Sequence, residues 1–196
     1  MSQRTADHPI DPQFLQRWSP RAFTGEAIPA ETLLGFLEAA RWAPSAFNAQ
    51  PWRFIWARRD TAAWAPLFDT LLPFNQVWAG QASALVLVLS QTRWVAPGKT
   101  EAQDNGSHAF DAGAAWGHLA LQTTLAGWHA HGIGGFDRAA ARSALAIPAD
   151  YQPQAVIAIG KLGDKSQLPE ALQAREFPSA RLPLSAVAAE GSFNFA

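Results

Sequence analysis

The chain has 196 residues, of which 48% are hydrophobic and 16% charged, with a formal net charge of -1 and no cysteine. This size suits one folded domain, and the lack of cysteine excludes disulfide frameworks, thiolate catalysis and cysteine-type zinc sites. The chain has no excess of positive charge, so we expect no binding to nucleic acid. Residues 1–12 are polar and lack the apolar segment of a signal peptide, and no apolar run reaches membrane-spanning length. We therefore expect a soluble, cytoplasmic protein that does not bind membranes.

The N-terminal part offers the first candidate site. Residues 1–13 have the features of a loose arm, and Arg17, Ser19 and Arg21 follow at i, i+2 and i+4. In an extended segment this spacing places all three side chains on one side, where two guanidiniums and a hydroxyl can bind an anion. The alternative is a solvated pair of surface arginines, which is the commoner meaning of an isolated motif of this kind.

The most distinctive stretch is residues 43–52, which read Ala-Pro-Ser-Ala-Phe-Asn-Ala-Gln-Pro-Trp. Pro44 and Pro51 fix their own φ angles and hold the preceding residues extended, so the backbone between them is stiff. Such a loop can present the amides of Asn48 and Gln50 to a flat polar ligand. A helix-to-strand turn anchored by a tryptophan is the alternative interpretation.

Hydrophobic periodicity predicts the regular elements. The expected helices cover residues 30–42, 61–72, 109–125 and 138–145, and the expected strands cover residues 54–57, 84–90 and 154–159. Pro66 should interrupt the second helix, and the continuous apolar run at residues 84–90 predicts a strand covered on both faces. Residues 92–105 indicate a loop. In the third helix, small residues form a stripe that would let another helix approach, inside the monomer or across a two-fold axis: Gly113, Gly117, Ala120 and Thr124.

A second informative segment, residues 127–137, contains three glycines in four residues, which allow the backbone to approach a ligand closely. Asp137 is placed to cap the next helix. His129 and His131 alternate as on a strand, but no third ligand stands at a matching spacing, so we expect no metal site.

Two less regular regions complete the chain. Asn75 lies among aromatic residues and is either a turn cap or a ligand donor. The tail, about residues 161–196, has little helical period but remains rich in Leu, Val and Phe, so it should pack on something, such as a partner subunit. We find no internal repeat and no linker, and therefore expect residues 1–196 to form a single domain.

Several of these features occur in a fixed order: Arg17-x-Ser19-x-Arg21, Pro44-Ser45-x-x-Asn48-x-Gln50-Pro51-Trp52, Asn75, Gly134-Gly135-Phe136-Asp137 and Arg181-x-Pro183. In this order and spacing the sequence resembles the FMN-dependent nitroreductase family over roughly residues 14–187. The resemblance implies an α+β fold with a mixed central sheet flanked by helices. It also implies an intertwined homodimer with FMN at the interface, with the C-terminal tail packed on the partner subunit.

The resemblance further implies roles at the phosphate end of FMN. Arg17 and Arg181 would hold the phosphate, Ser19 would contact the phosphate or the ribityl chain, and Arg21 would lie against the N1/O2 edge of the ring. Some family members carry a second basic residue two places before the tail arginine, where this chain has Ser179. Phosphate binding is therefore expected to rest more heavily on Arg17 and Arg181.

At the ring, the resemblance implies that the amides of Gly134 and Gly135 point at N5 and O4. No side chain is expected to be catalytic, because the flavin carries the chemistry and Arg21 and Gly134 tune it. Many members have Glu at the position of Gly134, so a side-chain contribution to substrate choice is absent here. Further cofactor contacts are expected from Trp18, Asn48, Asn75 and Ile133 and, across the interface, from Pro44, Ser45 and Ala46.

The expected activity is that of an NAD(P)H-dependent FMN oxidoreductase working by a ping-pong mechanism. NADPH or NADH would reduce the flavin and leave, and a small-molecule acceptor would then bind, such as a nitroaromatic or a quinone. Reductive dehalogenation and benzimidazole synthesis occur on the same fold and remain alternatives. A non-catalytic flavin-binding module is an alternative from a different class.

Overall fold

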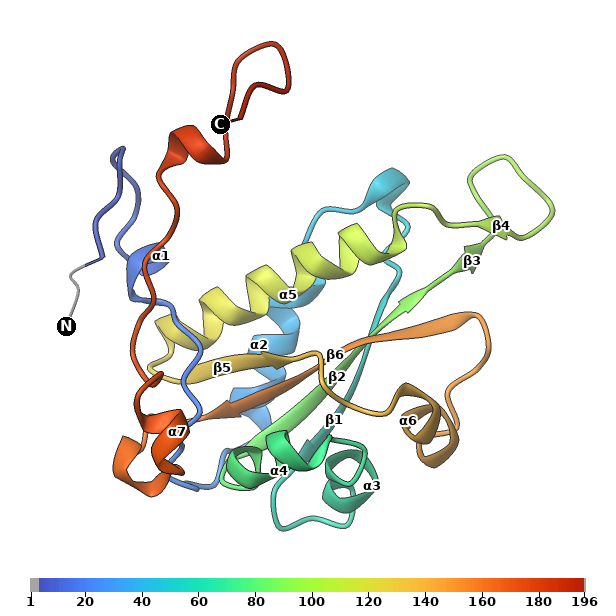
Figure 1. Ribbon diagram of the computed structural model, residues 1–196. Coiled ribbons are helices and arrows are strands. Elements are labelled where there is room, and N and C mark those ends of the chain that lie inside the picture. Colours follow the sequence, from blue (N-terminus) through green and yellow to red (C-terminus); the bar gives the residue numbers. More distant parts are fainter. Residues whose placement is uncertain (1–3, 196) are drawn as a thin grey trace.

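The computed structural model describes residues 4–195 and has a four-stranded sheet at its centre (Figure 1). The strands lie in the order β1 (Trp52–Arg58), β2 (Ala84–Gln91), β6 (Tyr151–Gly160) and β5 (His129–Ile133). All three pairings between these strands are antiparallel. A register shift between Val88 and Leu89 places Leu89 opposite Pro153, and such irregularities accommodate a residue that has no N–H to donate.

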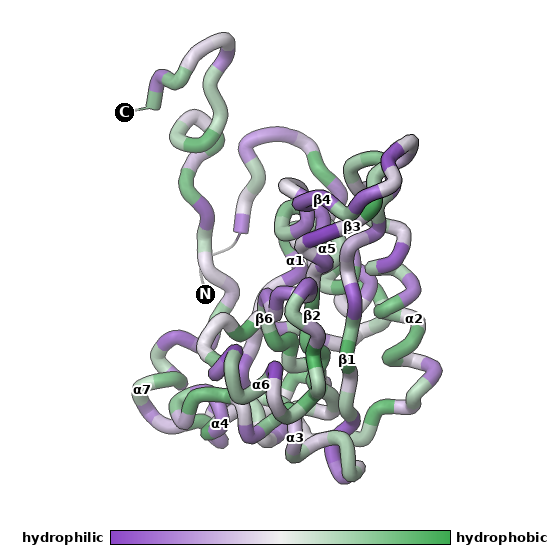
Figure 2. Tube along the Cα trace, turned by 90° about the vertical axis from the view of Figure 1, so that its right-hand side faces the viewer, coloured by the Kyte–Doolittle hydropathy of each residue, from purple (hydrophilic) through white to green (hydrophobic). Residues whose placement is uncertain are grey.

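Both faces of the sheet are covered, so the central strand β2 is buried along nearly its whole length. Leu85 and Leu87 enter one hydrophobic core, whereas Val86 and Val88 enter the other, as expected for side chains that alternate along a strand. Figure 2 shows apolar residues concentrated along the central strands. The prediction of a strand at residues 84–90 that is covered on both faces is confirmed.

One face is covered by the two long helices, α2 (Ala30–Arg41) and α5 (His108–Leu125), which pack against each other. In α2 the acidic Glu31 lies in the first turn and the basic Arg41 in the last, which suits the helix dipole. Leu33, Phe36 and Ala40 are buried at helical spacing. Both helices agree with their predicted bounds to within one residue.

The opposite face carries three short helices, α3 (Trp64–Phe68), α4 (Pro73–Ala79) and α6 (Arg138–Ala144). The prediction of one helix over residues 61–72 is correct only for residues 64–68, and Pro66 lies within the first turn of α3 without interrupting it. Leu72 has ψ 147° because it precedes Pro73, and Pro73 then begins α4 in the first helical turn. The cap predicted for α6 is confirmed, since the Asp137 carboxylate accepts from two backbone N–H groups in the first turn, each at 2.9 Å.

Two segments outside the predicted strands also contain strands. Residues 92–105 include a small hairpin of β3 (Arg93–Trp94) and β4 (Gln103–Asp104), in which Arg93 pairs with Asp104. The glycine-rich segment contains β5, as the alternation of its histidines indicated. The predicted strands at residues 54–57 and 154–159 are confirmed and extend further at both ends.

After η2 (Lys165–Gln167) and α7 (Glu170–Gln173), the chain runs away from the sheet beside the N-terminal residues and includes a last turn, η3 (Leu184–Ala186) (Figure 1). We call residues 4–12 and 177–195 the arm–tail segment. The Asp7 carboxylate accepts from the Leu184 N–H at 2.7 Å, so its two parts are bonded together. Among the described residues, no helix is both long and apolar enough to cross a membrane.

Candidate functional site

The arginine segment, residues 17–21, follows directly on α1 (Gln13–Gln16). The backbone leaves the helix at Arg17, where φ is -63° and ψ is 123°. Arg17 Nη1 donates to Ser19 Oγ at 3.3 Å, so these two side chains lie on the same side of the segment. The extended geometry assumed for the Arg-x-Ser-x-Arg motif is therefore present at its start.

Contacts with β5 fix the arginine segment to the sheet. The His131 ring donates from Nδ1 to the carbonyl of Pro20 at 2.9 Å, and Trp18 packs edge-on against His129 with ring centroids 6.1 Å apart. Burial lowers the pKa of both histidines, so both rings are neutral near pH 7. The described chain holds no group of three or more His, Asp or Glu residues placed to bind a metal ion.

Arg21 has a buried acidic partner that the sequence motif did not reveal. The Glu176 side chain is only 2% exposed, and its Oε2 lies 3.7 Å from Arg21 Nη1. The other oxygen, Oε1, accepts from the N–H groups of Arg21 and Ala22 at 2.6 and 2.8 Å. Arg21 is therefore not an isolated cation, because Glu176 both orients its backbone and offsets part of its charge.

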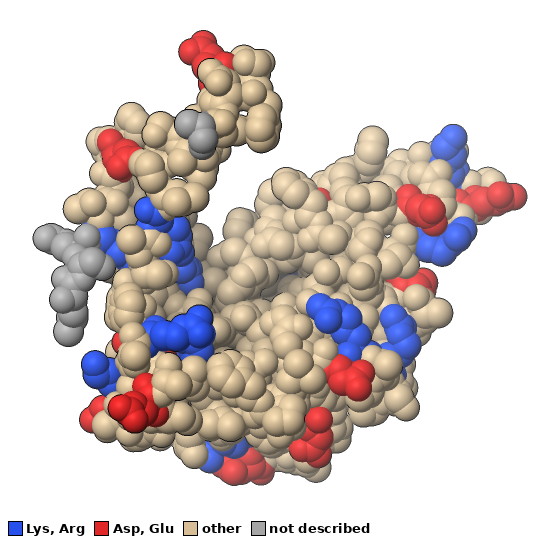
Figure 3. All heavy atoms as spheres, viewed as in Figure 1, with Lys and Arg blue, Asp and Glu red and all other residues tan. Residues whose placement is uncertain are grey.

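Arg17 belongs to a cluster of three arginines, together with Arg4 from the arm and Arg181 from the tail. Burial lowers the pKa of Arg17, and the positive charges of Arg181 and Arg4 lower it further. Within residues 4–195, none of the three forms an ion pair with an acidic side chain. Figure 3 shows basic side chains gathered on this part of the surface, beside a hollow that separates the tail from the body. The cluster therefore has the electrostatics of an anion site.

The glycine segment, residues 133–136, leaves the end of β5 and is tied to α4. Asn75 Nδ2 donates to the carbonyl of Gly135 at 2.9 Å, and a Cβ at Gly135 would lie 2.6 Å from that nitrogen. A Cβ at Gly134 would meet nothing within 4 Å, so there is open space beside this residue. The preceding residue, Ile133, is buried in the core. In the described chain the N–H groups of Gly134 and Gly135 donate to no protein acceptor. These two amides are thus free for a ligand.

The proline loop, residues 43–51, is held in a strained conformation by its own polar groups. It contains the short turn η1 (Ala46–Asn48), and φ is positive at Phe47, Asn48 and Gln50. Gln50 donates from its N–H to Ser45 Oγ at 3.0 Å and from Nε2 to the carbonyl of Asn48 at 3.0 Å. Gln50 therefore stabilises the loop internally, whereas Pro44 and the Phe47 side chain face solvent in the single chain.

Asp111 connects the proline loop to the first turn of α5, although no sequence motif pointed to it. It is 3% exposed, and its Oδ2 accepts from the Ala46 N–H at 3.3 Å and from Ser107 Oγ at 3.0 Å. A buried carboxylate that accepts from a loop backbone restrains the loop, because moving the loop would leave the charge without partners.

The arginine segment and the proline loop lie at opposite ends of α5 (Figure 1). The loop is bonded to Asp111 in the first turn of the helix, whereas the arginine segment is bonded to β5, which begins four residues after the helix ends. The helix has 18 residues and is therefore about 27 Å long. Within one chain, the predicted ligand contacts thus fall into two separate groups.

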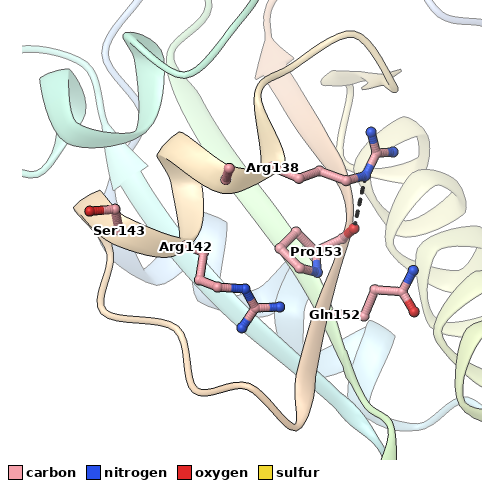
Figure 4. A pocket seen from close by; sticks show the side chains of 6 residues that line it. Arg138, Arg142, Ser143, Gln152 and Pro153 are labelled. Atoms are coloured by element: carbon pink, nitrogen blue, oxygen red, sulfur yellow. Dashed lines mark hydrogen bonds between the residues drawn. The ribbon is translucent and has the colours of Figure 1, made fainter.

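A second hollow lies between α6 and β6 and contains none of the predicted site residues. There Arg138 Nε donates to the carbonyl of Pro153 at 3.3 Å (Figure 4). Arg142 donates to the carbonyls of Ile147 and Tyr151 at 3.0 and 2.7 Å. Arg142 braces the turn between the helix and the strand, and Arg138 ties the helix to β6, so we assign the hollow a structural role.

Three residues of the site were missed from the sequence: Arg4, Asp111 and Glu176. Arg4 contacts Ser179, and Glu176 contacts Arg21, across 175 and 155 positions of the chain, so no local spacing could reveal them. Of the three, only Asp111 could have been noticed in the sequence, because it is an acidic residue within a mostly apolar helix.

Comparison with known proteins identifies the fold and the family. Residues 14–161 match the model of the nitroreductase family. A solved structure described as an oxidoreductase containing FMN is 47% identical and superposes with a TM-score of 0.95, over 100% of this chain and 99% of that chain. A putative nitroreductase in complex with FMN from Desulfovibrio desulfuricans is 27% identical, with a TM-score of 0.73, over 96% of this chain and 100% of that chain.

Among curated sequences, an uncharacterised 15.4 kDa protein of Mycolicibacterium smegmatis is 36% identical over 114 residues, which cover 56% of this chain and 71% of that protein. The family model spans most of the chain, from the end of α1 to the end of the central sheet. The chain therefore belongs to the nitroreductase family.

Proposed function

We propose that the protein is an FMN-dependent oxidoreductase that takes hydride from NADH or NADPH and reduces a flat oxidised acceptor by a ping-pong mechanism. The observation that carries the proposal is the arginine cluster around Arg17 and Arg181, which has no acidic partner in the described chain. A phosphate dianion satisfies such a cluster through charge-assisted hydrogen bonds. Two structural relatives, described as containing FMN, support the choice of ligand.

At the phosphate end, Arg17 and Arg181 would bind the anion, and Ser19 would add a hydroxyl donor. Arg17 Nη1 already donates to Ser19 Oγ at 3.3 Å, which places the two groups side by side. A guanidinium offers five donors in a fixed fork, so Arg17 can keep this bond and still bind phosphate with its other nitrogens.

At the ring end, the free amides of Gly134 and Gly135 would donate toward N5 and O4 of the flavin. Asn75 uses Nδ2 on the carbonyl of Gly135, and its Oδ1 makes no hydrogen bond within the described chain, which leaves it for the pyrimidine portion. When bound, FMN supplies the capacity to accept and donate hydride, which no side chain offers. Arg21 would place positive charge at the N1/O2 edge, reduced by its pairing with Glu176.

We also propose that the working form is a homodimer in which the proline loop covers the flavin of the second copy. The loop and the arginine segment lie at opposite ends of α5, so a second chain would bring them together. The stripe on α5 supports this, because a Cβ at Gly113 or Gly117 would meet nothing within 4 Å in the single chain. Exposed apolar side chains around these elements also suit an interface: Phe47 at 82%, Phe110 at 83% and Leu182 at 71%.

The proposed activity is tested by spectroscopy. We expect the purified protein to bind FMN, to show its visible spectrum and to be bleached by NADH or NADPH without oxygen. Protein that takes up no FMN would refute the flavoenzyme proposal, whereas bound FMN that neither nucleotide reduces would favour a non-catalytic flavin-binding module. Sedimentation tests the assembly, and a stable monomer that retains FMN would contradict the shared site.

Phosphate binding is tested by Arg17→Ala and Arg181→Ala, each measured by FMN titration. Each change should weaken binding by about 1.5–3 kcal/mol, the usual contribution of a hydrogen bond to a charged group. Unchanged FMN affinity in both variants would show that the phosphate lies elsewhere.

A further inference from the structure

Arg4 joins three backbone segments that surround the proposed phosphate site. Its Nε donates to the carbonyl of Ser179 at 2.8 Å, and its Nη1 donates to the carbonyls of Leu15 and Arg17 at 2.9 and 2.7 Å. One guanidinium therefore connects the arm, the end of α1 and the tail. An arginine that bonds three carbonyls in this way fixes the segments relative to one another, because its nitrogens are held in one plane.

We propose that Arg4 positions Arg17 and Arg181 as a single site for the FMN phosphate and supplies the third positive charge of that site. This inference rests on the proposed FMN binding and assigns a positioning residue that no sequence motif contains. Arg4 acts on Arg17 through the main chain, since it donates to the carbonyl of Arg17, whose side chain would bind the phosphate.

The connection to Arg181 runs through a shared acceptor. The carbonyl of Ser179 accepts from Arg4 Nε at 2.8 Å and from Arg181 Nη1 at 3.4 Å. Arg181 Nη1 also donates to the carbonyl of Ala180 at 3.0 Å, while its Nε and Nη2 make no hydrogen bond in the described chain. Two nitrogens of Arg181 are thus available to bind a ligand.

Electrostatics gives a second line of support. Burial and the charge of Arg181 both lower the pKa of Arg4, as expected for cations held together without an acidic partner. Mutual repulsion destabilises the arm–tail segment unless an anion binds there. A bound phosphate would relieve this repulsion and stabilise the segment, so ligand binding and ordering of the tail are coupled.

The test compares FMN with riboflavin, which has the same ring and no phosphate. Full-length apoprotein is titrated with each flavin while the quenching of flavin fluorescence is followed, using Arg4→Ala, Arg4→Lys and the control Arg93→Ala. Arg93 lies on the β3–β4 hairpin, on the opposite side of the chain from the N-terminal arm (Figure 1), and Arg93→Ala removes the same charge far from Arg4. We expect Arg4→Ala to raise the Kd for FMN about tenfold or more and the Kd for riboflavin less than about threefold.

Arg4→Lys should give an intermediate loss, because an ammonium keeps the charge but lacks the planar fork that bonds the three carbonyls. Arg93→Ala should bind both flavins like the parent. An equal loss of FMN and riboflavin in Arg4→Ala would overturn the inference, since it would indicate a general effect on the fold. An unchanged FMN affinity would overturn it too.

A flavin-free measurement separates this inference from the proposed function. Thermal unfolding is compared in inorganic phosphate and in chloride at equal ionic strength. Phosphate should raise the Tm of the parent and of Arg93→Ala more than that of Arg4→Ala. Equal stabilisation of all three proteins would overturn the role of Arg4, whereas a parent that responds to phosphate but binds no flavin would refute only the FMN proposal.

Discussion

The central sheet and the arm–tail segment are both rich in apolar side chains, but only the sheet buries them within one chain. Leu85 and Leu87 on β2 are 0% exposed, whereas Leu182 and Phe193 in the tail are 71% and 91% exposed. The polar groups differ in the same way. The sheet pairs its backbone in regular ladders, whereas the tail carries Arg181, which has no acidic partner in the described chain.

This difference indicates which parts of the protein depend on other molecules. The sheet is complete as soon as the chain folds, because helices cover both of its faces. The tail leaves apolar surface and positive charge exposed, which are the two features that a partner subunit and a phosphate would satisfy. Stability should therefore depend on the sheet, and ligand binding and assembly on the tail.

The largest expected effect tests whether stability depends on the sheet. Leu87→Ala should lower the free energy of unfolding by about 2–5 kcal/mol, because it leaves a cavity in a fully packed core. Leu182→Ala, the matched change in the tail, should alter unfolding of the monomer by about 0.5 kcal/mol or less, measured at protein concentrations below the dimer Kd, and should instead weaken the proposed dimer. Urea unfolding and sedimentation measure the two effects. Equal losses of stability would contradict the comparison.

Asp111→Ala tests whether the proline loop is held by the helix or by the partner. Removing the carboxylate leaves the N–H of Ala46 without its acceptor, which should cost about 1–3 kcal/mol of stability, whereas the Ser107 hydroxyl can still donate to Asn105 Oδ1 at 3.1 Å. The loop should also become sensitive to proteolysis. The exposed Asp104 serves as a control, and Asp104→Ala should behave like the parent. A protected loop in Asp111→Ala would show that other contacts hold it.

Glu176→Gln and Arg21→Ala should shift the flavin reduction potential in opposite directions. A lone guanidinium about 4 Å from the ring would stabilise the reduced flavin by roughly 4 kcal/mol, or about 90 mV. Because Glu176 offsets part of this charge, we expect Arg21→Ala to lower the potential by only about 30 mV and Glu176→Gln to raise it by a similar amount. Dye-equilibrated reductive titration measures both shifts, and shifts of the same sign would exclude this pairing as the cause.

The smallest effect concerns pH and the contact between the sheet and the arginine segment. Burial lowers the pKa of His131. The hydrogen bond to the Pro20 carbonyl and the charge of Glu176 raise it in part, and the charge of Arg21 lowers it, so the pKa lies below its ordinary value. As the pH falls below the ordinary value of 6.5, the unfolded chain therefore takes up the proton first and the folded state loses stability.

The loss should be about 1 kcal/mol per pH unit just below that value. His131→Asn keeps a donor for the carbonyl of Pro20 but cannot titrate, so its unfolding free energy should depend less steeply on pH between 7 and 5. Parallel curves for parent and variant would assign the pH dependence to other groups, such as His129.

The sequence predicts the parts of the fold that depend on local pattern. Helical spacing of apolar residues marks α2 and α5, a continuous apolar run marks β2, and Asp137 marks the start of α6. The prediction fails between the sheet strands β1 and β2, where α3 ends at Phe68 and not at Leu72, and where α4 begins at Pro73 without having been predicted. The apolar pattern suggested one longer helix up to Leu72, but Leu72 itself is extended because it precedes Pro73.

The candidate site is predictable to the extent that its residues lie in short motifs. The Arg-x-Ser-x-Arg and Gly-Gly stretches are found by spacing, but Arg4 and Glu176 reach them through long-range contacts. Both residues change the electrostatics, because Arg4 adds a positive charge beside Arg17 and Glu176 offsets part of the charge of Arg21. Motifs therefore indicate the kind of ligand, and the folded structure is needed to assess how strongly each charge acts.

The three residues with positive φ in the proline loop have a consequence for assembly. Phe47, Asn48 and Gln50 hold this conformation in the single chain, through bonds within the loop and to Asp111. The loop is thus preorganised, and docking a preformed surface loses less conformational entropy than ordering a flexible one. Association of two copies should accordingly be limited by diffusion and orientation rather than by loop rearrangement, with a rate constant in the usual range of about 10⁵–10⁷ M⁻¹s⁻¹.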